Sequence, residues 1–593
     1  MADKQVVIIG AGPAGLTAGL ELTKHNVHPV IFEQNDKVGG LSRTESYKGY
    51  YFDLGGHRFF TKAEAVNKMW REVLGDDFIL RPRLSRIYYQ GKFFNYPLKP
   101  FNALFGLGLW QAILIGLSFI KWQILPYKHE DTFEQWVTNR FGKRLFEIFF
   151  KTYTEKVWGV PTSELKAEWA AQRIKDLSMK TALLSMFIKP KNKIKTLIEE
   201  FHYPRRGPGM FWEAVRREIE RAGGTVELNS NVIRVNRQGN RIHSVVFSCN
   251  GSGEEVVPGT DFISSMPVSE FVRKLDPPPA DVLNAANKLT YRDFITVCLI
   301  VNQADLFPDN WIYVHSPGVK VGRIQNFKNW SPDMVPDPSK TSLGMEYFCT
   351  EGDELWNTPD ADLIELARRE IDQIGLARYQ DVEDGTVVRV LKAYPVYDSD
   401  YREYLTQVRQ FVDGLENFQT IGRNGLHRYN NQDHAMMTGM LAVRNLMLGE
   451  HNDLWSVNTD QEYHEEVREP AAKEEIDQVF KGALRRVFSR LDPVALGVSF
   501  GITAGSILLL ATAFLVIKGG PYVGYNLQLL NQFFPGYEVT LAGSLIGLVY
   551  ASIVGFAVGW AFAYIRNVTV FISALIIHRD IEFHLLRRFL DYM

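Results

Sequence analysis

The first apolar block of the chain is short, and glycines follow it at once. Gln5 to Ile9 has the pattern of a buried strand. Apolar residues after the glycines recur with helical spacing from Ala14 towards Lys24, and a second short strand is expected at Val30 to Phe32. A strand, a glycine turn, a helix and a strand in this order predict a βαβ unit within an α/β fold.

Further apolar patterns predict that the first sheet is completed much later in the sequence. Gly224 to Val235 and Arg241 to Phe247 have the pattern of a two-stranded β-ribbon. Asp261 to Pro267 is expected to return as a strand to the first sheet, and Ala435 to Leu448 is expected to form a helix. The domain that contains the first sheet should therefore be discontinuous.

Two long apolar runs lie near the C-terminus. Pro493 to Ile517 carries no charge and would be about 37 Å long as a helix, more than the ~30 Å of bilayer hydrocarbon. Val539 to Ile565 has the same character, and Lys518 is the only basic residue in the loop between the runs. The basic residues that flank the pair are Lys481, Arg485, Arg486, Arg490, Arg566, Arg579, Arg587 and Arg588.

By the positive-inside rule, these flanks predict a two-pass transmembrane hairpin with both chain termini and the main body in the cytoplasm. The hairpin and a C-terminal helix would occupy residues 493–593, after a charged bridge at 471–492. A buried helical pair in a soluble protein is the alternative.

A third apolar run, Ala103 to Ile120, is interrupted by Gly106, Gly108 and Gly116 and contains Trp110. If it crossed the membrane once, the N-terminal glycine motif would lie across the membrane from later segments that complete the same domain. We therefore expect this run to lie in the membrane interface or to pack in a substrate domain, and both possibilities remain open.

Composition narrows the classes of function. At 593 residues the chain is too long for a single core, so at least two domains are expected. The net charge of -2 and the lack of a basic stripe with interleaved aromatics make nucleic-acid binding unlikely as a role. Cys249, Cys298 and Cys349 are too widely spaced for a disulfide framework or a metal pair, so no metal site is expected. Met1 is followed directly by an apolar strand, without a secretory signal pattern.

The strongest chemical signal is GAGPAG, which places Gly10, Gly12 and Gly15 between the first strand and its helix. Glycines there let the backbone approach a pyrophosphate at the positive helix N-terminus. Glu33 ends the next strand, where its carboxylate can accept hydrogen bonds from an adenosine ribose. The motif predicts a dinucleotide site in a Rossmann-like domain.

KVGGLSRT, at Lys37 to Thr44, adds a second glycine pair and Arg43 directly after this acid. This resembles the flavoprotein pattern of the glutathione-reductase-like and amine-oxidase-like superfamily, which implies FAD rather than NAD as the resident cofactor. We expect a discontinuous FAD-binding domain of the glutathione-reductase type and an α+β substrate domain. The expected FAD-binding segments are 1–100, 201–268 and 415–470, the mainly helical substrate and interface segment is 101–200, and the substrate sheet is 269–414.

Further motifs follow one another along the body: YFDLGGHRFF, FNYPLKP, KVWGVPTSELKAEWAAQRI, WIYVHSPGVKVGRIQNFKNWSP, AYPVY and IGRNGLHRYNNQDHAMMTGMLAVRNL. In order and residue type they resemble UDP-galactopyranose mutases, particularly the eukaryotic type, from the first strand to about Asn445. The C-terminal hairpin lies outside this resemblance.

The resemblance implies roles for individual residues. The candidate FAD-binding residues are Gly10, Gly12, Pro13, Ala14, Gly15, Glu33, Gly39, Gly40, Leu41, Ser42, Arg43, Gly55, Gly56, His57, Val232, Arg423, Asn431 and Gln432. The candidate substrate-binding residues are Tyr96, Arg173, Trp311, Tyr313, Arg323, Asn329, Tyr394 and Tyr429. The candidate catalytic residues are His57, Arg173 and Arg323.

Arginine forks match phosphate oxygens, so Arg173 and Arg323 could converge on a diphosphate. The alternative for each arginine is a structural ion pair, and for His57 a structural histidine. Asp433 and His434 are expected only to cap the helix that follows them.

The resemblance implies a redox-neutral interconversion of pyranose and furanose sugars through N5 of the reduced flavin, with NAD(P)H only as an external reductant. Lys99 stands where the eukaryotic mutases have a neutral amide near the uracil base. A soluble sugar nucleotide also would not require a membrane hairpin. We therefore hypothesise a polyprenyl-linked sugar phosphate or diphosphate as substrate, with a UDP-sugar as the other possibility.

The expected partners are this substrate, membrane lipids and further copies of the chain in a homo-oligomer. An FAD-dependent oxidase or desaturase of an amphiphilic substrate is the alternative enzyme. A flavin-bearing scaffold without turnover is the remaining class of function.

Overall fold

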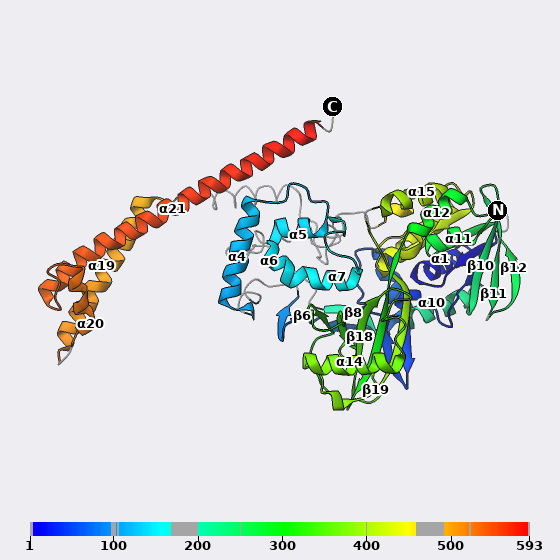
Figure 1. Cartoon of the computed structure of the whole chain (residues 1–593), viewed down its shortest axis with the longest axis horizontal. Helices are drawn as coiled ribbons and strands as arrows, with labels where there is room; N and C mark the ends of the chain where they lie inside the picture. Colours follow the sequence, from blue (N-terminus) through cyan, green and yellow to red (C-terminus); the bar gives the residue numbers. More distant parts are fainter. Residues whose placement is uncertain are drawn as a thin grey trace. The chain divides into compact units, whose positions relative to one another are not determined.

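The computed structural model describes residues 4–96, 102, 106–167, 200–249, 251–398, 400–457, 491–520 and 523–590. The chain divides into two compact units, Met1–Val467 and Arg468–Met593 (Figure 1).

A parallel five-stranded sheet forms the centre of one half of the first unit. Its strand order is β20 (Phe418–Thr420), β13 (Asp261–Ser264), β1 (Val6–Ile9), β2 (Val30–Phe32) and β9 (Thr225–Glu227). All four pairings are parallel. The expected return strand therefore lies beside β1, and strands from distant parts of the sequence share this sheet.

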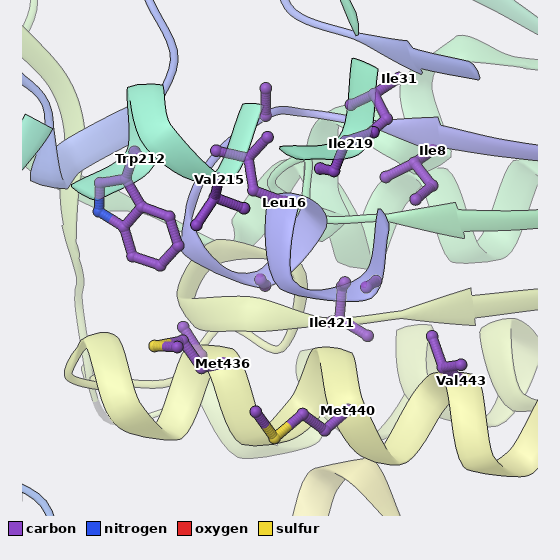
Figure 2. Close-up of a cluster of buried hydrophobic side chains, with 14 of the residues drawn as sticks. Ile8, Leu16, Ile31, Trp212, Val215, Ile219, Ile421, Met436, Met440 and Val443 are labelled. Carbon is purple, nitrogen blue, oxygen red and sulfur yellow. The ribbon is translucent and has the colours of Figure 1, made fainter. Parts of the chain in front are cut away.

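Three helices pack around this sheet: α1 (Pro13–Thr23), α10 (Gly209–Arg221) and α17 (Gln432–Leu448). Figure 2 shows Leu16 of α1 in the apolar cluster that also contains Val215 of α10 and Met440 of α17. Gly439 permits this packing, because a Cβ there would lie 2.5 Å from the carbonyl oxygen of Ala14. The close approach holds α17 against α1.

A β-ribbon is present, and it continues into a four-stranded sheet. The ribbon begins at Ser230, because residues 225–227 of the predicted first ribbon strand form β9 of the five-stranded sheet instead. The order of the four-stranded sheet is β12 (Ser252–Pro258), β11 (Arg241–Cys249), β10 (Ser230–Gln238) and β14 (Leu275–Asp276). Helices α11 (Val268–Lys274), α12 (Ala280–Lys288) and α15 (Tyr401–Asp413) share a core with it.

A seven-stranded sheet forms the other half of the first unit. Its order is β19 (Val382–Pro395), β15 (Tyr291–Val301), β18 (Thr341–Cys349), β17 (Arg323–Asn326), β16 (Trp311–Val314), β6 (Ser85–Tyr89) and β7 (Lys92–Asn95). Strands β6 and β7 join this sheet, although the sequence analysis places residues 1–100 in the FAD-binding domain.

The two faces of this sheet carry different kinds of side chain. Helix α14 (Asp360–Ile374) covers one face, where Leu363 and Ile371 share a core with Ile324 (Figure 1). The strand register places Tyr313, Arg323 and Glu346 side by side in one row. Because neighbouring residues of a strand point to opposite faces, this row lies on the face away from α14.

A helical layer follows β7 along the chain. It consists of α4 (Leu109–Ile124), α5 (Phe133–Phe141), α6 (Lys143–Phe146), a π-helical turn (Glu147–Lys151) and α7 (Thr152–Trp158). One apolar cluster joins Ile115 of α4 and Trp158 of α7 to Tyr394 of the seven-stranded sheet. The first unit also contains η1 (Gly40–Ser42), β3 (Thr44–Tyr47), β4 (Tyr50–Asp53), α2 (Glu64–Leu74), β5 (Phe78–Pro82), β8 (Glu200–Pro204), α13 (Phe327–Trp330) and α16 (Gly422–Gly425).

The second unit contains α19 (Pro493–Lys518), α20 (Tyr525–Gln528) and α21 (Leu541–Leu590). Pro493–Lys518 and Leu541–Thr569 are long and apolar enough to cross a membrane. Both predicted runs are therefore helical.

Small residues let α19 and α21 pack closely. Gly497, Gly501 and Gly505 recur every fourth residue of α19. A Cβ on Gly501 would lie 2.7 Å from the carbonyl oxygen of Ser552, and one on Gly505 would lie 2.8 Å from that of Leu548. Such small-residue contacts are typical of helices that associate in lipid.

Asp53 joins two segments of the first unit from a buried position on β4. Thr44 Oγ1 donates a hydrogen bond of 2.8 Å to one carboxyl oxygen, and the Tyr203 hydroxyl donates to the other. Burial raises the pKa of Asp53 to about 7, although both hydrogen bonds act in the opposite direction.

Replacement of Gly501 by leucine is expected to force α19 and α21 apart, because even a Cβ at this position has no space. Spin labels at exposed residues 507 and 549, in a cysteine-free background, would report the distance between the helices. The distance should lengthen or broaden in Gly501→Leu. Ile502→Leu, at an exposed neighbouring position, is the control and should leave it unchanged. An unaltered distance in Gly501→Leu would contradict this packing.

The protonation of Asp53 predicts a pH-dependent stability. The folded chain retains a proton up to about pH 7 that an unfolded chain releases near 3.8. The free energy of unfolding should therefore decrease as the pH rises through this window, by about 4 kcal/mol from this group. Asp53→Asn should not show this decrease. The difference between its thermal midpoint and that of the wild type should therefore grow, in favour of the variant, from pH 5 to pH 8. Tryptophan fluorescence would measure the thermal midpoints.

Tyr203→Phe provides a second measurement, because it removes a hydrogen bond that lowers the pKa of Asp53. The pH at which stability changes should move upward in this variant. Identical pH dependence in all three proteins would rule out a buried, protonated Asp53.

Candidate active site

The glycine loop has the geometry of a phosphate-binding turn. Gly10 has a φ of +97°, and a Cβ on Gly15 would lie 1.9 Å from the carbonyl oxygen of Gly10. Gly12 is the N-cap of α1, and among the described residues the only atom within 4 Å of a Cβ there would be Gly40 Cα, at 3.9 Å. The N-terminus of α1 is thus open to a ligand that approaches its backbone N–H groups.

Glu33 is held against this loop at the end of β2. Its carboxylate accepts a hydrogen bond of 2.9 Å from the backbone N–H of Ala11 and another of 3.0 Å from that of Asn35. The side chain is buried. This is the expected position for an acid that receives the ribose hydroxyls of a dinucleotide.

The second glycine pair lies directly beside the first loop. Gly39 N–H donates to the carbonyl oxygen of Ala11 at 2.8 Å, and Gly39 has a φ of +100°. A Cβ on Gly40 would lie 3.2 Å from Gly12 Cα. Arg43 pairs with Glu45 at 2.6 Å and donates to the carbonyl oxygen of Gly40 at 3.2 Å. Arg43 therefore stabilises the loop at Gly40 through this hydrogen bond.

The remaining candidates near this end are fully or partly buried. Ser42 is 3% exposed, and Leu41 packs against the apolar cluster of the helical layer. Val232 shares a core with Phe32, and its carbonyl oxygen accepts a hydrogen bond of 2.6 Å from Lys274 Nζ. Pro13 and Ala14 form the first turn of α1.

The predicted residues at the start of α17 lie where that helix begins. Asn431 is the N-cap, and its N–H donates to His434 Nδ1 at 3.3 Å. The helix begins at Gln432, three residues before the predicted start, because Asn431 supplies a cap that the apolar pattern does not reveal. Asp433 lies inside the helix, and burial raises its pKa.

These residues fit FAD. Besides the open glycine loop, Gln432 Oε1, Arg423 Nε and Trp212 Nε1 are among the buried polar atoms that have no hydrogen-bond partner within the described part of the chain. Buried polar groups are normally paired, so these atoms suit a large polar ligand. FAD bound here would be held by the glycine loop, Glu33 and the α17 N-terminus.

Arg323 is the central residue of the seven-stranded sheet's open face. Its Nε donates to Glu346 Oε2 at 2.9 Å, and its Nη2 also donates to the Tyr394 hydroxyl at 3.3 Å. Gln325 Nε2 donates to the other oxygen of Glu346 at 2.9 Å. Desolvation lowers the pKa of Arg323, but Glu346, Tyr394 and Tyr153 together raise it well above its usual value. The guanidinium is a permanent buried cation.

His57 approaches Arg323 on the glycine loop after β4. A Cβ on Gly55 would lie 3.6 Å from Arg323 Nη2 and 3.8 Å from His57 Cε1, and one on Gly56 would lie 3.1 Å from Gln325 Nε2. Desolvation, followed by the charges of Arg323 and Arg423, lowers the pKa of His57 to about 3. The imidazole is therefore neutral at physiological pH.

Arg423 connects the cofactor residues to the substrate face. Its guanidinium lies 4.1 Å from the ring centroid of Tyr429 and 4.8 Å from that of Tyr394. The two tyrosine rings stack at 5.6 Å. Two arginines thus converge on one pair of tyrosines, with Arg323 hydrogen bonded to Tyr394.

Aromatic rings continue along the same face. Tyr313 lies 4.8 Å from Tyr96, 5.5 Å from Tyr153 and 6.3 Å from Trp311, measured between ring centroids. Trp311 also stacks on Trp330 at 5.3 Å. These rings could receive a flat or apolar part of a substrate.

The structure does not place two of the predicted substrate residues, Asn329 and Arg173, in this group of side chains. Asn329 uses its side-chain amide to donate to the carbonyl oxygens of Phe307 and Asp309, at 2.7 and 2.9 Å, so it supports the loop before β16. Arg173 lies outside the described residues.

Sequence reasoning missed Glu346, Gln325 and Tyr153. Glu346 is the only acid in an otherwise uncharged, fully buried strand, which is a signal for a buried ion pair. Tyr153 had no such signal, because only tertiary packing brings α7 to the sheet. Burial raises the pKa of Tyr153 well above its usual value, so its hydroxyl remains protonated.

The arrangement can bind an anion beside a flavin. Arg323 and Arg423 supply positive charge, Tyr394 supplies a hydroxyl, and neutral His57 adds no charge. Within the described ranges no group of three or more His, Cys, Asp or Glu side chains could hold a metal ion.

Two curated proteins of different activity are similar to the chain. Over 174 residues it is 29% identical to a Klebsiella pneumoniae protein named "Probable UDP-galactopyranose mutase". This match covers 28% of this chain and 44% of that protein. Over 294 residues it is 24% identical to 15-cis-phytoene desaturase from an Oncidium hybrid cultivar, which covers 44% of this chain and 46% of that protein. The chain thus matches less than half of the length of either relative.

A solved structure and a family model cover more of the chain. The fold is shared with reduced UDP-galactopyranose mutase, with a TM-score of 0.67 and 22% identity over 77% of this chain and 98% of that one. This confirms the predicted α/β fold. Residues 13–428 match the model described as flavin containing amine oxidoreductase, which implies FAD as the cofactor. The chain belongs to the family of flavin containing amine oxidoreductases.

Proposed function

We propose that this flavoenzyme is a mutase that interconverts the pyranose and furanose forms of a sugar phosphate or diphosphate. The observation that carries the proposal is the buried Arg323, which is hydrogen bonded to Tyr394 beside a tyrosine pair that also contacts Arg423. The similarity to a mutase in sequence and fold supports it.

The side chains of this site have separable tasks in the proposed reaction. Arg323 and the Tyr394 hydroxyl would bind the phosphate that leaves and returns, since charged hydrogen bonds to phosphate are strong and directional. Glu346 and Gln325 would fix the direction of the Arg323 guanidinium. Bound FAD, when reduced, would supply a nucleophilic nitrogen at the sugar's anomeric carbon.

His57 would help to position the substrate by hydrogen bonding and would not transfer a proton. Its imidazole stays neutral down to about pH 3 because it is desolvated and lies near two cations. A neutral ring there leaves the positive charge of Arg323 and Arg423 for the phosphate and can still donate or accept one hydrogen bond.

We further propose that the carrier is a polyprenyl lipid, with UDP as the second possibility. Two helices of the second unit are long and apolar enough to cross a membrane, which suits a substrate that resides there. Their basic flanks favour a cytoplasmic body, where NAD(P)H could reduce the flavin.

An oxidase or desaturase of an amphiphilic substrate is the second candidate. It is favoured by the match to a desaturase, which extends over 294 residues where the mutase match extends over 174. An apolar substrate would not require the buried Arg323 on the open face of the sheet. The two candidates therefore differ in what they ask of that residue.

The proposed function predicts isomerisation without net electron transfer. The full chain in detergent would be reduced anaerobically with dithionite and given lipid-linked or UDP-linked galactose, and ring isomers would be quantified by NMR. Isomer should form only with reduced flavin, and the flavin should remain reduced after many turnovers. Stoichiometric reoxidation of flavin by the substrate, without a ring isomer, would establish the oxidoreductase instead.

Arg323→Ala is expected to weaken the binding of the sugar phosphate about 100-fold, which corresponds to about 3 kcal/mol. Arg86→Ala is the matched control, because Arg86 also pairs with a buried acid, Asp309, at 2.6 Å. Arg86 precedes Ile87, the register partner of Tyr313, so it points to the opposite face of the sheet.

Binding would be measured by equilibrium dialysis at matched FAD content, with thermal midpoints recorded in parallel. Both variants should lose stability, since each leaves a buried carboxylate unpaired, and only Arg323→Ala should lose affinity. Equal affinity in the two variants would remove Arg323 from the substrate site.

A further inference from the structure

Helix α4 exposes a continuous apolar stripe on the surface of the first unit. Trp110, Leu117 and Ile124 are 70%, 60% and 71% exposed, and Ile113 and Ile120 lie between them at helical spacing. Residues three or four apart share one face of a helix, so these five side chains form a single strip. Large apolar side chains in such a row indicate a partner surface.

The opposite face of α4 is packed firmly against α5 and α6. Ile115 is buried, and Ser118 Oγ accepts a hydrogen bond of 3.1 Å from Arg144 N–H. A Cβ on Gly142 would lie 2.9 Å from the backbone of Phe119, so the two segments are in direct contact. The stripe is therefore a fixed outer surface of the body.

The dimensions of α4 exclude a transmembrane orientation. Its 16 residues span about 24 Å, less than the ~30 Å of bilayer hydrocarbon. One of its faces is also occupied by protein, as Ile115 and Ser118 show. A helix that is apolar on one face and packed against the protein on the other can lie along a membrane surface but cannot cross the membrane.

The charges and aromatic rings around the stripe favour lipid over a protein partner. Helix α4 contains no acidic residue, and its one charged residue is Lys121. Lys121 Nζ lies 5.9 Å from the ring of Trp122, which stacks on Tyr127 at 4.6 Å. Tryptophan, tyrosine and lysine at the edge of an apolar strip are typical of the headgroup region of a bilayer.

We propose that α4 lies in the membrane interface, with the stripe from Trp110 to Ile124 inserted among the lipid acyl chains. The two apolar helices of the second unit place a membrane within reach of the same chain. The hairpin would hold the enzyme at the bilayer, and α4 would set the orientation of the catalytic body on it.

The start of α4 is linked to the candidate substrate face. Lys92 Nζ donates to the carbonyl oxygen of Gly106 at 2.8 Å, and a Cβ on Gly106 would lie 2.5 Å from the ring of Phe94. Two residues after Phe94, the Tyr96 ring lies 4.8 Å from that of Tyr313. A lipid-linked sugar could thus keep its lipid in the membrane while its phosphate reaches Arg323. This step, unlike the insertion of α4, rests on the proposed function.

The test uses the full chain in proteoliposomes, with one spin label at residue 117 in a cysteine-free background. A label at residue 256 is the matched control, because Val256 is an equally exposed apolar residue on β12, far from α4 in sequence. Collisions with oxygen, which concentrates in lipid, and with a water-soluble nickel chelate would be measured for each label.

The ratio of oxygen to nickel collisions should be several-fold higher at residue 117 than at residue 256. Equal ratios would place the stripe in water, and low collision rates with both reagents would show that protein covers it; either outcome overturns the proposal. Because this measurement needs no turnover, lipid insertion without isomerisation would reject only the proposed function. Isomerisation with a solvent-exposed label would reject only the role of α4.

Discussion

The ion pair between Arg323 and Glu346 determines how the substrate half of the molecule must be built. A buried guanidinium is strongly destabilising unless a carboxylate and further hydrogen bonds compensate it, and here Glu346 supplies the charge while Gln325 occupies the second carboxyl oxygen. The two partners face each other across β17 and β18. A slip of one residue would turn Arg323 towards the apolar core under α14, so the pair specifies the register of the sheet as well as the charge of the site.

The site itself forms where the two sheets of the first unit approach each other, and glycines make this approach possible. Gly55 and Gly56 bring the loop of His57 within contact distance of Arg323 and Gln325. From the FAD-binding side, Gly422, with a φ of +79°, places a loop against Ala14 and carries Arg423 towards the tyrosine pair. The candidate cofactor and substrate residues are therefore coupled by backbone contacts that no larger residue would permit, and these contacts bring together residues from distant parts of the sequence.

Local patterns predicted the elements whose cause is local. The strand, turn and helix around GAGPAG and the two C-terminal helices follow from periodicity and from glycine geometry, and all are present. The ribbon predicted from Gly224 is present only from Ser230, because Thr225–Glu227 pairs with β2 instead. The start of α17 was predicted three residues late, because Asn431 caps the helix through a polar contact that an apolar pattern cannot reveal. Tyr153 and Glu346 were not anticipated, since their roles arise only when α7 and β18 meet the same face of the sheet. Asn329 was expected at the substrate, yet its amide satisfies two backbone carbonyls.

Large exposed apolar side chains are concentrated in a few segments of the molecule. Across the described residues, large exposed apolar side chains form rows on α4, α19 and α21 and also gather at Tyr525, Leu529 and Phe533 between the last two helices, whereas others, such as Leu391 and Val256, occur singly. Glycines form the contact face between α19 and α21, and Ile507 and Phe514 point away from it. Only something outside this helix pair can shield these two side chains from water. The apolar rows on α4, α19 and α21 thus lie outside the packed cores of the two units, and their exposure to water is unfavourable. A substrate with a charged phosphate and an apolar chain would match both kinds of surface: the largely buried Arg323 for its head and, under our proposal, a membrane beside α4 for its tail.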